Sequence, residues 1–394
     1  MNPEKFEIKI DAAHKEIARK AREFAEREVE PVSREIHEKG VISRSLLRKA
    51  GEQGFFGICI PRELSGVGSD LLGLALMIEE LSKASTSFAL AILVPYLFTI
   101  PLMTFGSQQQ KSKYVPKIAS GKLYAAHAAT EPTSGSDLAG IKTNAKRRGA
   151  EWILDGVKSF VSGAEWADYF LVLARVPDFG EDPRKQLTFF IVDREADGLD
   201  IGISDDLIGV KGIRIGYLEL RGVRVPDENR VGAVGEGLKI ASETYGRTRV
   251  GAAALALGAM QALLNQTINY AVKRKAFGRS IASFQATKFK LVDIFADLIN
   301  VKLLVYWSAR TLDESPEKLE AASLAKLRAA EMLEKAAIKA IEIHGGVGVI
   351  KKTMVERFLL DSQILKMIEG TPEIQRIIIS RFLAKNLDDE AEKD

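Results

Sequence analysis

The hydrophobic pattern of this 394-residue chain changes its period twice. From residue 11 to about 121, apolar residues recur at the spacing of amphipathic helices, and between about 124 and 231 they follow the shorter period of strands. After Gly237 the pattern is helical to the end. Helices and sheets bury their apolar surfaces in different ways, so each change of period marks a new layer. The pattern therefore predicts an α+β fold with an N-terminal helical domain (1–121), a central β domain (122–232) and a C-terminal helical domain (233–394).

The pattern also places individual elements within these domains. Helices are expected at 71–81 and 238–260, and from about 285, 316 and 351. Strands are expected at 169–176, 187–192 and 217–225. The dipeptide Asp155-Gly156 predicts a hairpin turn between strands at 152–154 and 157–161, because this pair favours the primed turns.

One run, residues 88–103, is almost wholly apolar. It is shorter than the roughly 20 residues that a membrane span needs, and Pro95 and Pro101 interrupt it. We interpret it as buried helix, broken or kinked at the prolines, and expect no membrane span. Its uncharged side chains are expected to form the wall of an apolar pocket, which Leu93, Tyr96, Leu97 and Phe98 would shorten.

Charge and composition exclude several classes of function. The net charge is +3 with both signs mixed along the chain, so no basic stripe indicates nucleic-acid binding. Cys59 is the single cysteine and the four histidines are scattered, so neither a disulfide framework nor a metal site is expected. Residues 1–30 are charged and amphipathic, without the apolar core of a secretory signal, which favours a cytoplasmic protein.

Residues 368–376 place a carboxylate, Glu369, on a glycine hinge before a helix. Thr371 fits the N-cap, Pro372 the first helical position, and Glu373 complements the positive end of the helix dipole. Taken locally, Glu369 is either a surface acid that favours a helix N-terminus or a base held at a hinge.

Four other segments are candidates for chemistry, and each also has an ordinary structural interpretation. The hydroxyl-rich loop 129–137 and the strand end 160–163 could face a planar ligand, or could be a polar connector and a turn. The cations of 273–278 could bind an anion or complement a helix dipole. The glycine turn at 342–348 allows close backbone approach to a phosphate, but it matches no standard nucleotide motif.

In this order and spacing, the segments resemble the acyl-CoA dehydrogenase family over nearly the whole chain. The matching motifs are Thr130-Glu131-Pro132 with Gly135-Ser136-Asp137, Asp155-Gly156-Val157-Lys158, Arg274-Lys275-Ala276-Phe277-Gly278 with Gln285, Gly345-Gly346-Val347-Gly348, and Glu369-Gly370-Thr371 with Ile374-Gln375-Arg376. The resemblance implies a central β-barrel-like domain, a C-terminal four-helix bundle, one FAD per subunit and a homotetramer. It also implies dehydrogenation of an acyl-CoA substrate and an electron-transfer flavoprotein as the acceptor.

The resemblance assigns roles to individual residues. Glu369 is the expected catalytic base, and its backbone N–H is expected to bind the thioester oxygen. The acyl-CoA is expected to contact Ser136, Tyr245, Arg249 and Gly370. Arg274, Phe277, Gln285 and the turn at 342–346 are expected to reach the FAD of a neighbouring subunit. The expected cofactor-binding residues are His127, Ala129, Thr130, Ser136, Phe160, Ser162, Arg274, Phe277, Gln285, Glu342, Gly345, Gly346, Thr371 and Glu373.

The chain departs from the family pattern at four positions. Phe160 stands where Trp is common, Ala276 where a hydroxyl is frequent, Glu342 where Gln is usual, and Gly246 where an acid is frequent. Ala276 and Glu342 are expected to weaken contacts to the cofactor pyrophosphate. Residues 246–249 contain no acid, although some relatives carry the base there, so Glu369 has no competitor.

Three alternative functions remain beside the dehydrogenase: an acyl-CoA oxidase, a decarboxylating acyl-CoA dehydrogenase, and a non-catalytic scaffold that binds acyl-CoA or flavin. The chain is short for an oxidase, residues 90–97 offer no cation for a distal carboxylate, and Glu369 argues against a scaffold. An uncharged acyl group of short to medium length is expected, because a charge facing the apolar wall would be unpaired.

Overall fold

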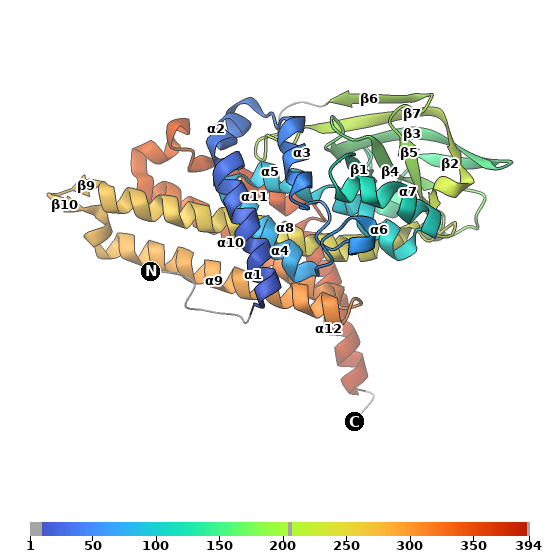
Figure 1. The fold of residues 1–394 in the computed structure, drawn as a ribbon. Helices are drawn as coiled ribbons and strands as arrows, with labels where there is room; N and C mark the ends of the chain where they lie inside the picture. Colours follow the sequence, from blue (N-terminus) through green and yellow to red (C-terminus); the bar gives the residue numbers. More distant parts are fainter. Residues whose placement is uncertain (1–9, 204–206, 392–394) are drawn as a thin grey trace.

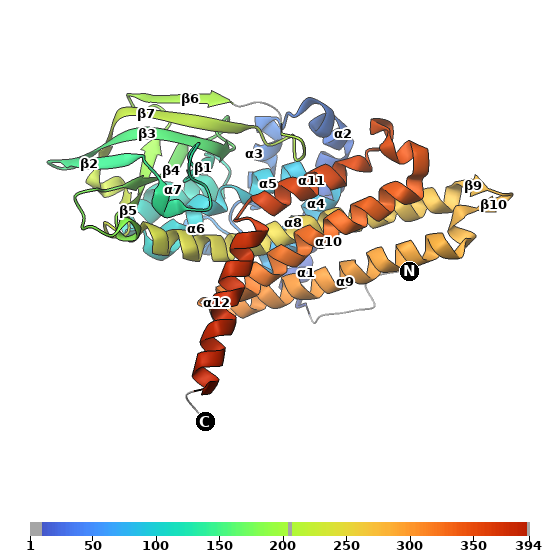
Figure 2. The same ribbon diagram turned by 180° about the vertical axis from the view of Figure 1, so that it is seen from behind.

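The computed structural model describes residues 10–203 and 207–391 and has the expected order of helices, strands and helices (Figure 1). The α+β fold predicted from the change of period is confirmed. The β domain lies at one end of the molecule, and helices from both ends of the chain form the rest. The two views show the C-terminal bundle on one side of the N-terminal helices (Figures 1 and 2).

The N-terminal domain contains seven α-helices among the described residues. Asp11, Ser43 and Asp70 cap three of them, because each side chain accepts a hydrogen bond from a backbone N–H in the first turn. A π-helical turn, Ala25–Val29, joins the first two. The helices are α1 (Ala12–Phe24), α2 (Glu30–Lys39), α3 (Arg44–Glu52), α4 (Leu71–Ala84), α5 (Thr86–Leu93), α6 (Tyr96–Phe105) and α7 (Gln108–Ala119).

The apolar run forms α5 and α6, which meet at Pro95 as expected, while Pro101 is accommodated inside α6. The stretch Thr86–Phe105 is long and apolar enough to cross a membrane. A window of 18 residues within it has a mean hydropathy of 2.0. However, 78% of this window is buried inside the protein. The apolar residues thus serve as core between the N-terminal and C-terminal helices.

The β domain is one twisted sheet in the order β6-β7-β3-β2-β4-β5-β8, with β1 parallel to β4. Along β4 and β5 almost every residue is buried, since helices cover one face and the curved sheet covers the other. The strands are β1 (Ala125–Ala128), β2 (Asn144–Arg148), β3 (Glu151–Ser162), β4 (Tyr169–Arg175), β5 (Leu187–Asp193), β6 (Leu199–Ile203), β7 (Ile215–Pro226) and β8 (Arg230–Val231).

The prediction of a hairpin turn at Asp155-Gly156 is wrong. These two residues lie inside the single strand β3, which pairs with β7 along its length and shifts register between Leu154 and Gly156. Gly156 has φ +152° and leaves no room for a Cβ against Thr143. A glycine in this place relieves a crowded bulge.

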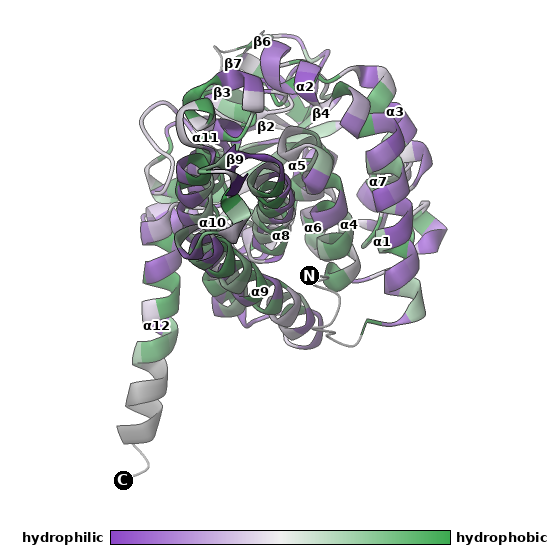
Figure 3. Ribbon diagram, turned by 90° about the vertical axis from the view of Figure 1, so that its left-hand side faces the viewer, coloured by the Kyte–Doolittle hydropathy of each residue, from purple (hydrophilic) through white to green (hydrophobic). Residues whose placement is uncertain are grey.

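The C-terminal domain is built around α8 (Gly237–Lys273), which contacts α4, α9 and α10. Gly258 of α8 lies so close to the Glu79 backbone that a side chain would not fit. Figure 3 shows mainly hydrophobic residues where α8, α9 and α10 meet and hydrophilic ones along the outer faces of α3 and α7. The remaining elements are β9 (Lys275–Ala276), β10 (Arg279–Ser280), α9 (Gln285–Glu314), α10 (Leu319–His344), α11 (Glu356–Met367) and α12 (Pro372–Ala391).

Two helix starts differ from expectation, because α10 begins at Leu319 rather than near 316 and α11 at Glu356 rather than near 351. Residues 351–353 form a 3₁₀ turn instead. The described part of α12 projects away from the body of the molecule (Figures 1 and 2). Its apolar side chains Ile377, Phe382 and Leu383 are exposed.

Candidate functional site

Glu369 lies on the loop between α11 and α12, where the backbone is left-handed. Its φ is +55°, and that of Gly370 is +97°. A Cβ at residue 370 would lie 2.8 Å from Nε2 of Gln375, so the second position requires glycine. A non-glycine residue at positive φ costs free energy and is typical of functional sites, which motivates the assignment of Glu369.

Three buried side chains hold the backbone of this loop. The Glu369 carbonyl accepts hydrogen bonds from Arg249 Nε and Gln375 Nε2, both at 3.0 Å. The Gly370 carbonyl accepts from Gln375 Nε2 at 2.9 Å and from Lys326 Nζ at 2.6 Å. The two peptide planes that follow the Cα of the base are therefore oriented by α8, α10 and α12 together.

The carboxylate of Glu369 has a direct partner on α8. Its Oε2 accepts a hydrogen bond of 2.8 Å from Thr248 Oγ1. Burial raises the pKa of Glu369 above its ordinary value, whereas this hydrogen bond and the charges of Arg249 and Lys326 lower it. A carboxylate in this position can take up a proton more readily than an exposed one.

His127 and Tyr245 extend the site toward the β domain. Tyr245 is three residues before Thr248 on α8, so both project from the same side of the helix. Its hydroxyl lies 2.8 Å from Nε2 of His127 on β1. Burial lowers the pKa of His127 to about 4, so this imidazole is neutral near pH 7. The structure thus brings His127, Tyr245, Arg249, Glu369 and Gly370 together around one seam between domains.

The loop 129–137 is fastened to β3 by a buried ion pair. Nζ of Lys158 lies 2.8 Å from Oε1 of Glu131 and donates to the Ala129 carbonyl at 3.1 Å. The Glu131 carboxylate also accepts from the backbone N–H groups of residues 142 and 143. The Thr130 carbonyl accepts from the Ser159 N–H at 2.9 Å. These contacts put Thr130 beside the strand that ends at Phe160 and Ser162.

Phe160 is an exposed aromatic ring on a strained backbone. Its side chain is 66% exposed, and its φ is +54° inside β3. Ser162 is the last residue of the same strand and is partly buried, whereas Ser136 is exposed in the preceding loop. An exposed ring at positive φ has no role in the core of a single chain, but it fits a flat ligand.

A second group of expected residues lies at the other end of α8. Arg249 and Arg274 are roughly 37 Å apart along this helix at 1.5 Å per residue. Phe277 beyond α8 is 95% exposed with φ +51°. A hollow of about 280 Å³ is lined there by Ala276, Phe277, Phe284, Lys290 and Glu342, among others. Within one chain, this group and the Glu369 group do not meet.

The remaining expected residues divide between these two groups. Gln285 is exposed at the start of α9, and Gly345 and Gly346 follow α10 with open space where a Cβ would be. Thr371 is partly buried and Glu373 is exposed at the start of α12, next to Glu369.

The residues at both groups fit parts of a flavin dinucleotide. Thr130, Phe160 and Ser162 offer hydroxyls and an aromatic ring where the loop after β1, the strand of His127, meets β3. The glycines Gly345 and Gly346 offer bare backbone at the other group. The departure at Glu342 is offset by Lys290, whose Nζ lies 2.6 Å from the Glu342 carboxylate. Since Arg274, Lys275 and Arg279 are exposed nearby, the surface around this hollow keeps the positive charge that a pyrophosphate needs.

Four residues of the site were given no role from the sequence, although two of them lie in the matching motifs: Thr248, Lys326, Gln375 and Lys158. The signal for Lys326 was present, because it shares a helix face with the buried residues Ala322, Ala329 and Ala330. A lysine on a buried face needs a partner. The partner itself, a carbonyl 44 residues later, has no sequence signal.

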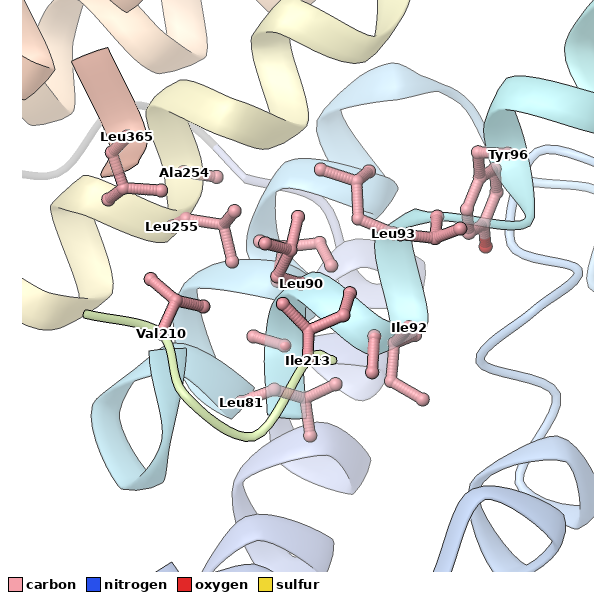
Figure 4. Packing of buried hydrophobic residues seen from close by; sticks show 14 of the residues in the cluster. Leu81, Leu90, Ile92, Leu93, Tyr96, Val210, Ile213, Ala254, Leu255 and Leu365 are labelled. Atoms are coloured by element: carbon pink, nitrogen blue, oxygen red, sulfur yellow. The ribbon is translucent and has the colours of Figure 1, made fainter. Parts of the chain in front are cut away.

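The apolar wall is composed differently from the expectation. The Tyr96 hydroxyl bonds to the backbone of Phe55 and Ile58, and Phe98 packs against Tyr114, so both point into the N-terminal core. Leu93 instead lies over Gly251, where a Cβ would be 2.5 Å from Leu93 Cδ1. Figure 4 shows Leu90 next to Leu255 of α8, with Val210 and Ile213 close by and Leu93 farther toward Tyr96.

Comparisons with known proteins match the three parts of the chain to one family. The N-terminal domain model of the acyl-CoA dehydrogenases matches residues 11–122, the middle domain model residues 126–223, and the C-terminal domain model residues 235–384. The 3-(aryl)acrylate reductase of Clostridium sporogenes is 36% identical over 373 residues, which are 94% of this chain and 98% of that protein.

Two further relatives also match nearly the whole chain. The caffeyl-CoA reductase-Etf complex subunit CarC of Acetobacterium woodii is 36% identical over 374 residues, or 94% of this chain and 98% of that protein. The structure of butyryl-CoA dehydrogenase from Megasphaera elsdenii is 28% identical with a TM-score of 0.93, covering 96% of this chain and all of that one.

Proposed function

This chain belongs to the acyl-CoA dehydrogenase family, and we propose that it interconverts an acyl-CoA that has a short, uncharged acyl group and the corresponding 2-enoyl-CoA, with Glu369 as the base. The family comprises flavin-dependent oxidoreductases, so the chain is an enzyme of that class. The substrate, the residue roles, the electron partner and the assembly are proposals that the following observations support.

The observation that carries the proposal is the setting of Glu369. The carboxylate is held by Thr248 on a loop whose carbonyls are fixed by Arg249, Gln375 and Lys326. An α-hydrogen next to a thioester is weakly acidic, so its removal needs a base with a raised pKa and fixed geometry. Burial supplies the raised pKa here. The backbone N–H of Glu369 is the chain's own donor for the thioester oxygen as it gains negative charge.

In the forward direction, the α C–H bond breaks, Glu369 takes the proton, and the β-hydrogen leaves with its electron pair as the double bond forms. A bound FAD would supply the acceptor for that hydride. His127, Ala129, Thr130, Phe160 and Ser162 would hold the flavin ring. Arg274, Phe277, Gln285, Glu342, Gly345 and Gly346 would hold the nucleotide half that belongs to a neighbouring subunit.

The contact between Leu93 and Gly251 supports a short acyl group. Gly251 is one turn beyond Thr248 on α8, and Leu93 covers it. An acyl chain that starts at Glu369 and follows α8 therefore meets a leucine after about 5 Å. The surrounding residues 90–97 contain no charge, so a terminal carboxylate would remain unpaired there.

An electron-transfer flavoprotein is the proposed electron partner. A relative of 36% identity is a subunit of a reductase-Etf complex. Two relatives are named as reductases, which favours a second hypothesis: the reaction of this chain runs from the enoyl-CoA to the acyl-CoA. Assays in both directions are needed, since the same base and flavin serve both.

The test of the base is Glu369→Gln, which keeps the shape of the side chain. The variant should retain its flavin and bind acyl-CoA, while anaerobic flavin reduction slows by about 10²- to 10⁴-fold or more. Glu195→Gln, an exposed carboxylate in the loop after β5, is the matched control. Flavin bleaching by Glu369→Gln at the wild-type rate would show that another group removes the proton.

The test of the substrate is a series from butyryl-CoA to palmitoyl-CoA with glutaryl-CoA alongside. Each buried methylene should add roughly 0.8 kcal/mol of binding until the chain reaches Leu93, after which kcat/KM falls. Leu93→Ala should move the optimum to longer chains. A palmitoyl optimum in the wild type would contradict the length argument, and a glutaryl optimum the charge argument. Parallel assays with oxygen alone would detect an oxidase.

A further inference from the structure

Lys326 is a buried lysine on α10 that donates hydrogen bonds to backbone carbonyls. The residue is only 1% exposed. Within the described residues, no carboxylate oxygen forms an ion pair with its Nζ. Burying an ammonium away from water is costly unless it is hydrogen-bonded, so its partners show what the charge is used for.

Both hydrogen-bond partners of Lys326 belong to the segment that carries Glu369. Nζ donates to the carbonyl of Lys366 at 2.7 Å and to the carbonyl of Gly370 at 2.6 Å. Lys366 lies in the last turn of α11, where carbonyls lack helical partners and the dipole is negative. Gly370 is one residue after the base. The ammonium therefore spans the segment, with one anchor on each side of Glu369.

A helix C-terminal cap alone would explain the bond to Lys366 but not the bond to Gly370. The Gly370 carbonyl is already bonded to Gln375, and the Glu369 carbonyl to Gln375 and Arg249. The second bond of Lys326 adds a charge to a backbone that was already anchored. The charged groups that act on Lys326 are Glu369, Arg249 and Glu373.

We propose that Lys326 is a positioning residue for the base: its ammonium fixes the carbonyls on both sides of Glu369 and holds a positive charge close to the carboxylate. The proposal rests on the proposed role of Glu369. The charge favours the ionised carboxylate, which offsets the effect of burial on that group. The burial that lowers the pKa of Lys326 to about 7 is in turn opposed by Glu369, so the two groups stabilise each other's charged forms.

The decisive variant is Lys326→Met, which keeps the volume and removes the donors and the charge. Lys335→Met, an exposed lysine nine positions later on the same helix, is the matched control. In Lys326→Met, the limiting rate of anaerobic flavin reduction should fall about 10- to 100-fold, because the base is less well placed. The Kd for acyl-CoA should change by less than about 3-fold. The acid limb of the pH profile should move to higher pH, since Glu369 loses a nearby cation.

Lys326→Gln separates the two parts of the proposal, because an amide can still donate to a carbonyl but has no charge. It should recover part of the lost rate while keeping the shifted pH profile. It also serves as the test if Lys326→Met does not fold. Exchange of the substrate α-proton with D2O, followed by NMR, gives a second measure of proton removal and should slow in parallel with flavin reduction.

An unshifted pH profile together with a wild-type reduction rate in either folded variant would overturn the proposal. If the variants have a lower melting temperature and less flavin but an unshifted pH profile, Lys326 only stabilises the fold and the proposed positioning role is wrong. Failure of the wild type itself to reduce its flavin with any acyl-CoA would instead count against the proposed function, so the two failures are distinguishable.

Discussion

At the scale of single residues, Glu369 is under two opposing influences. Burial favours its protonated form, while Thr248 Oγ1 at 2.8 Å and the charges of Arg249 and Lys326 favour the carboxylate. The balance of these influences sets the pKa of Glu369, and thus the pH above which its carboxylate is ionised and can accept a proton. Backbone strain at φ +55° is tolerated because three side chains hold the adjacent carbonyls.

This balance predicts the pH dependence of the reaction. Glu369 must be ionised to act as a base, so kcat/KM should rise with pH through a pKa above the ordinary value of about 4.3 for Glu. Thr248→Val removes a hydrogen bond to the ionised form and should move this rise to higher pH. Thr244→Val is the control, because the Thr244 hydroxyl donates to the Ile240 carbonyl within α8. A rise that moves to lower pH in Thr248→Val would contradict this picture.

The sign for stability follows from the same shift. A carboxyl group whose pKa is raised in the folded state holds its proton more tightly there than in the unfolded chain. Its contribution to the free energy of unfolding is therefore greatest below its unfolded pKa and declines as the pH rises through the folded value. The free energy of unfolding is therefore lower at the pH where Glu369 is ionised and can act as a base.

At the scale of elements, β3 connects the core of the β domain to the loop 129–137. Lys158 in the middle of β3 is fully buried and pairs with Glu131 at 2.8 Å. Phe160 and Ser162 lie two and four residues farther along the same strand. One strand therefore anchors the loop by its buried lysine and presents an exposed ring and a hydroxyl at its end.

Lys158→Met should lower the free energy of unfolding by about 3–5 kcal/mol, because it leaves the Glu131 charge buried without its cation. Urea denaturation would measure the loss. The double variant Lys158→Met/Glu131→Gln should recover part of it, since neither charge remains. Lys146→Met on β2, where the side chain is exposed, should change stability by less than about 0.5 kcal/mol. A loss in the control as large as in Lys158→Met would show that the ion pair is not the cause.

At the scale of the whole molecule, α8 separates two half-sites. Its N-terminal part carries Tyr245, Thr248 and Arg249, and beyond its C-terminal end lie Arg274 and the 95% exposed Phe277. A single chain cannot bring these groups to one flavin. The exposed apolar residues of the projecting α12 likewise have no partner among the described residues (Figure 2). Both features support the proposed assembly of neighbouring subunits.

Cofactor retention should consequently depend on assembly. Arg274→Ala should lose flavin on dilution more readily than the wild type, with loss of flavin and dissociation following the same concentration dependence. Light scattering and flavin absorbance measure the two events. Lys273→Ala removes a neighbouring charge of the same sign and is the control. An active monomer that keeps its full complement of flavin would refute the shared site.

The types of the elements and their order could be predicted from the sequence, because the period of apolar residues is a local property. The sequence also marked Glu369, because its carboxylate lies next to a glycine hinge, Gly370, directly before the helix start at Thr371-Pro372. The family motifs then gave roles to residues such as Arg249 and Phe277. All of these signals lie within short stretches of the chain.

How distant stretches of the chain meet could not be predicted from local patterns and was visible only in the fold. Thr248 reaches Glu369 across 121 positions, and Lys326 reaches Gly370 across 44. The turn expected at Asp155-Gly156 became part of β3 because pairing with β7 outweighed the local preference of the dipeptide. Tyr96 does not line the apolar wall, because its hydroxyl donates a hydrogen bond to the Phe55 carbonyl in the N-terminal core. Local preferences amount to about 1 kcal/mol, whereas burial and hydrogen bonding of a whole strand or side chain amount to several, so packing prevails where the two disagree.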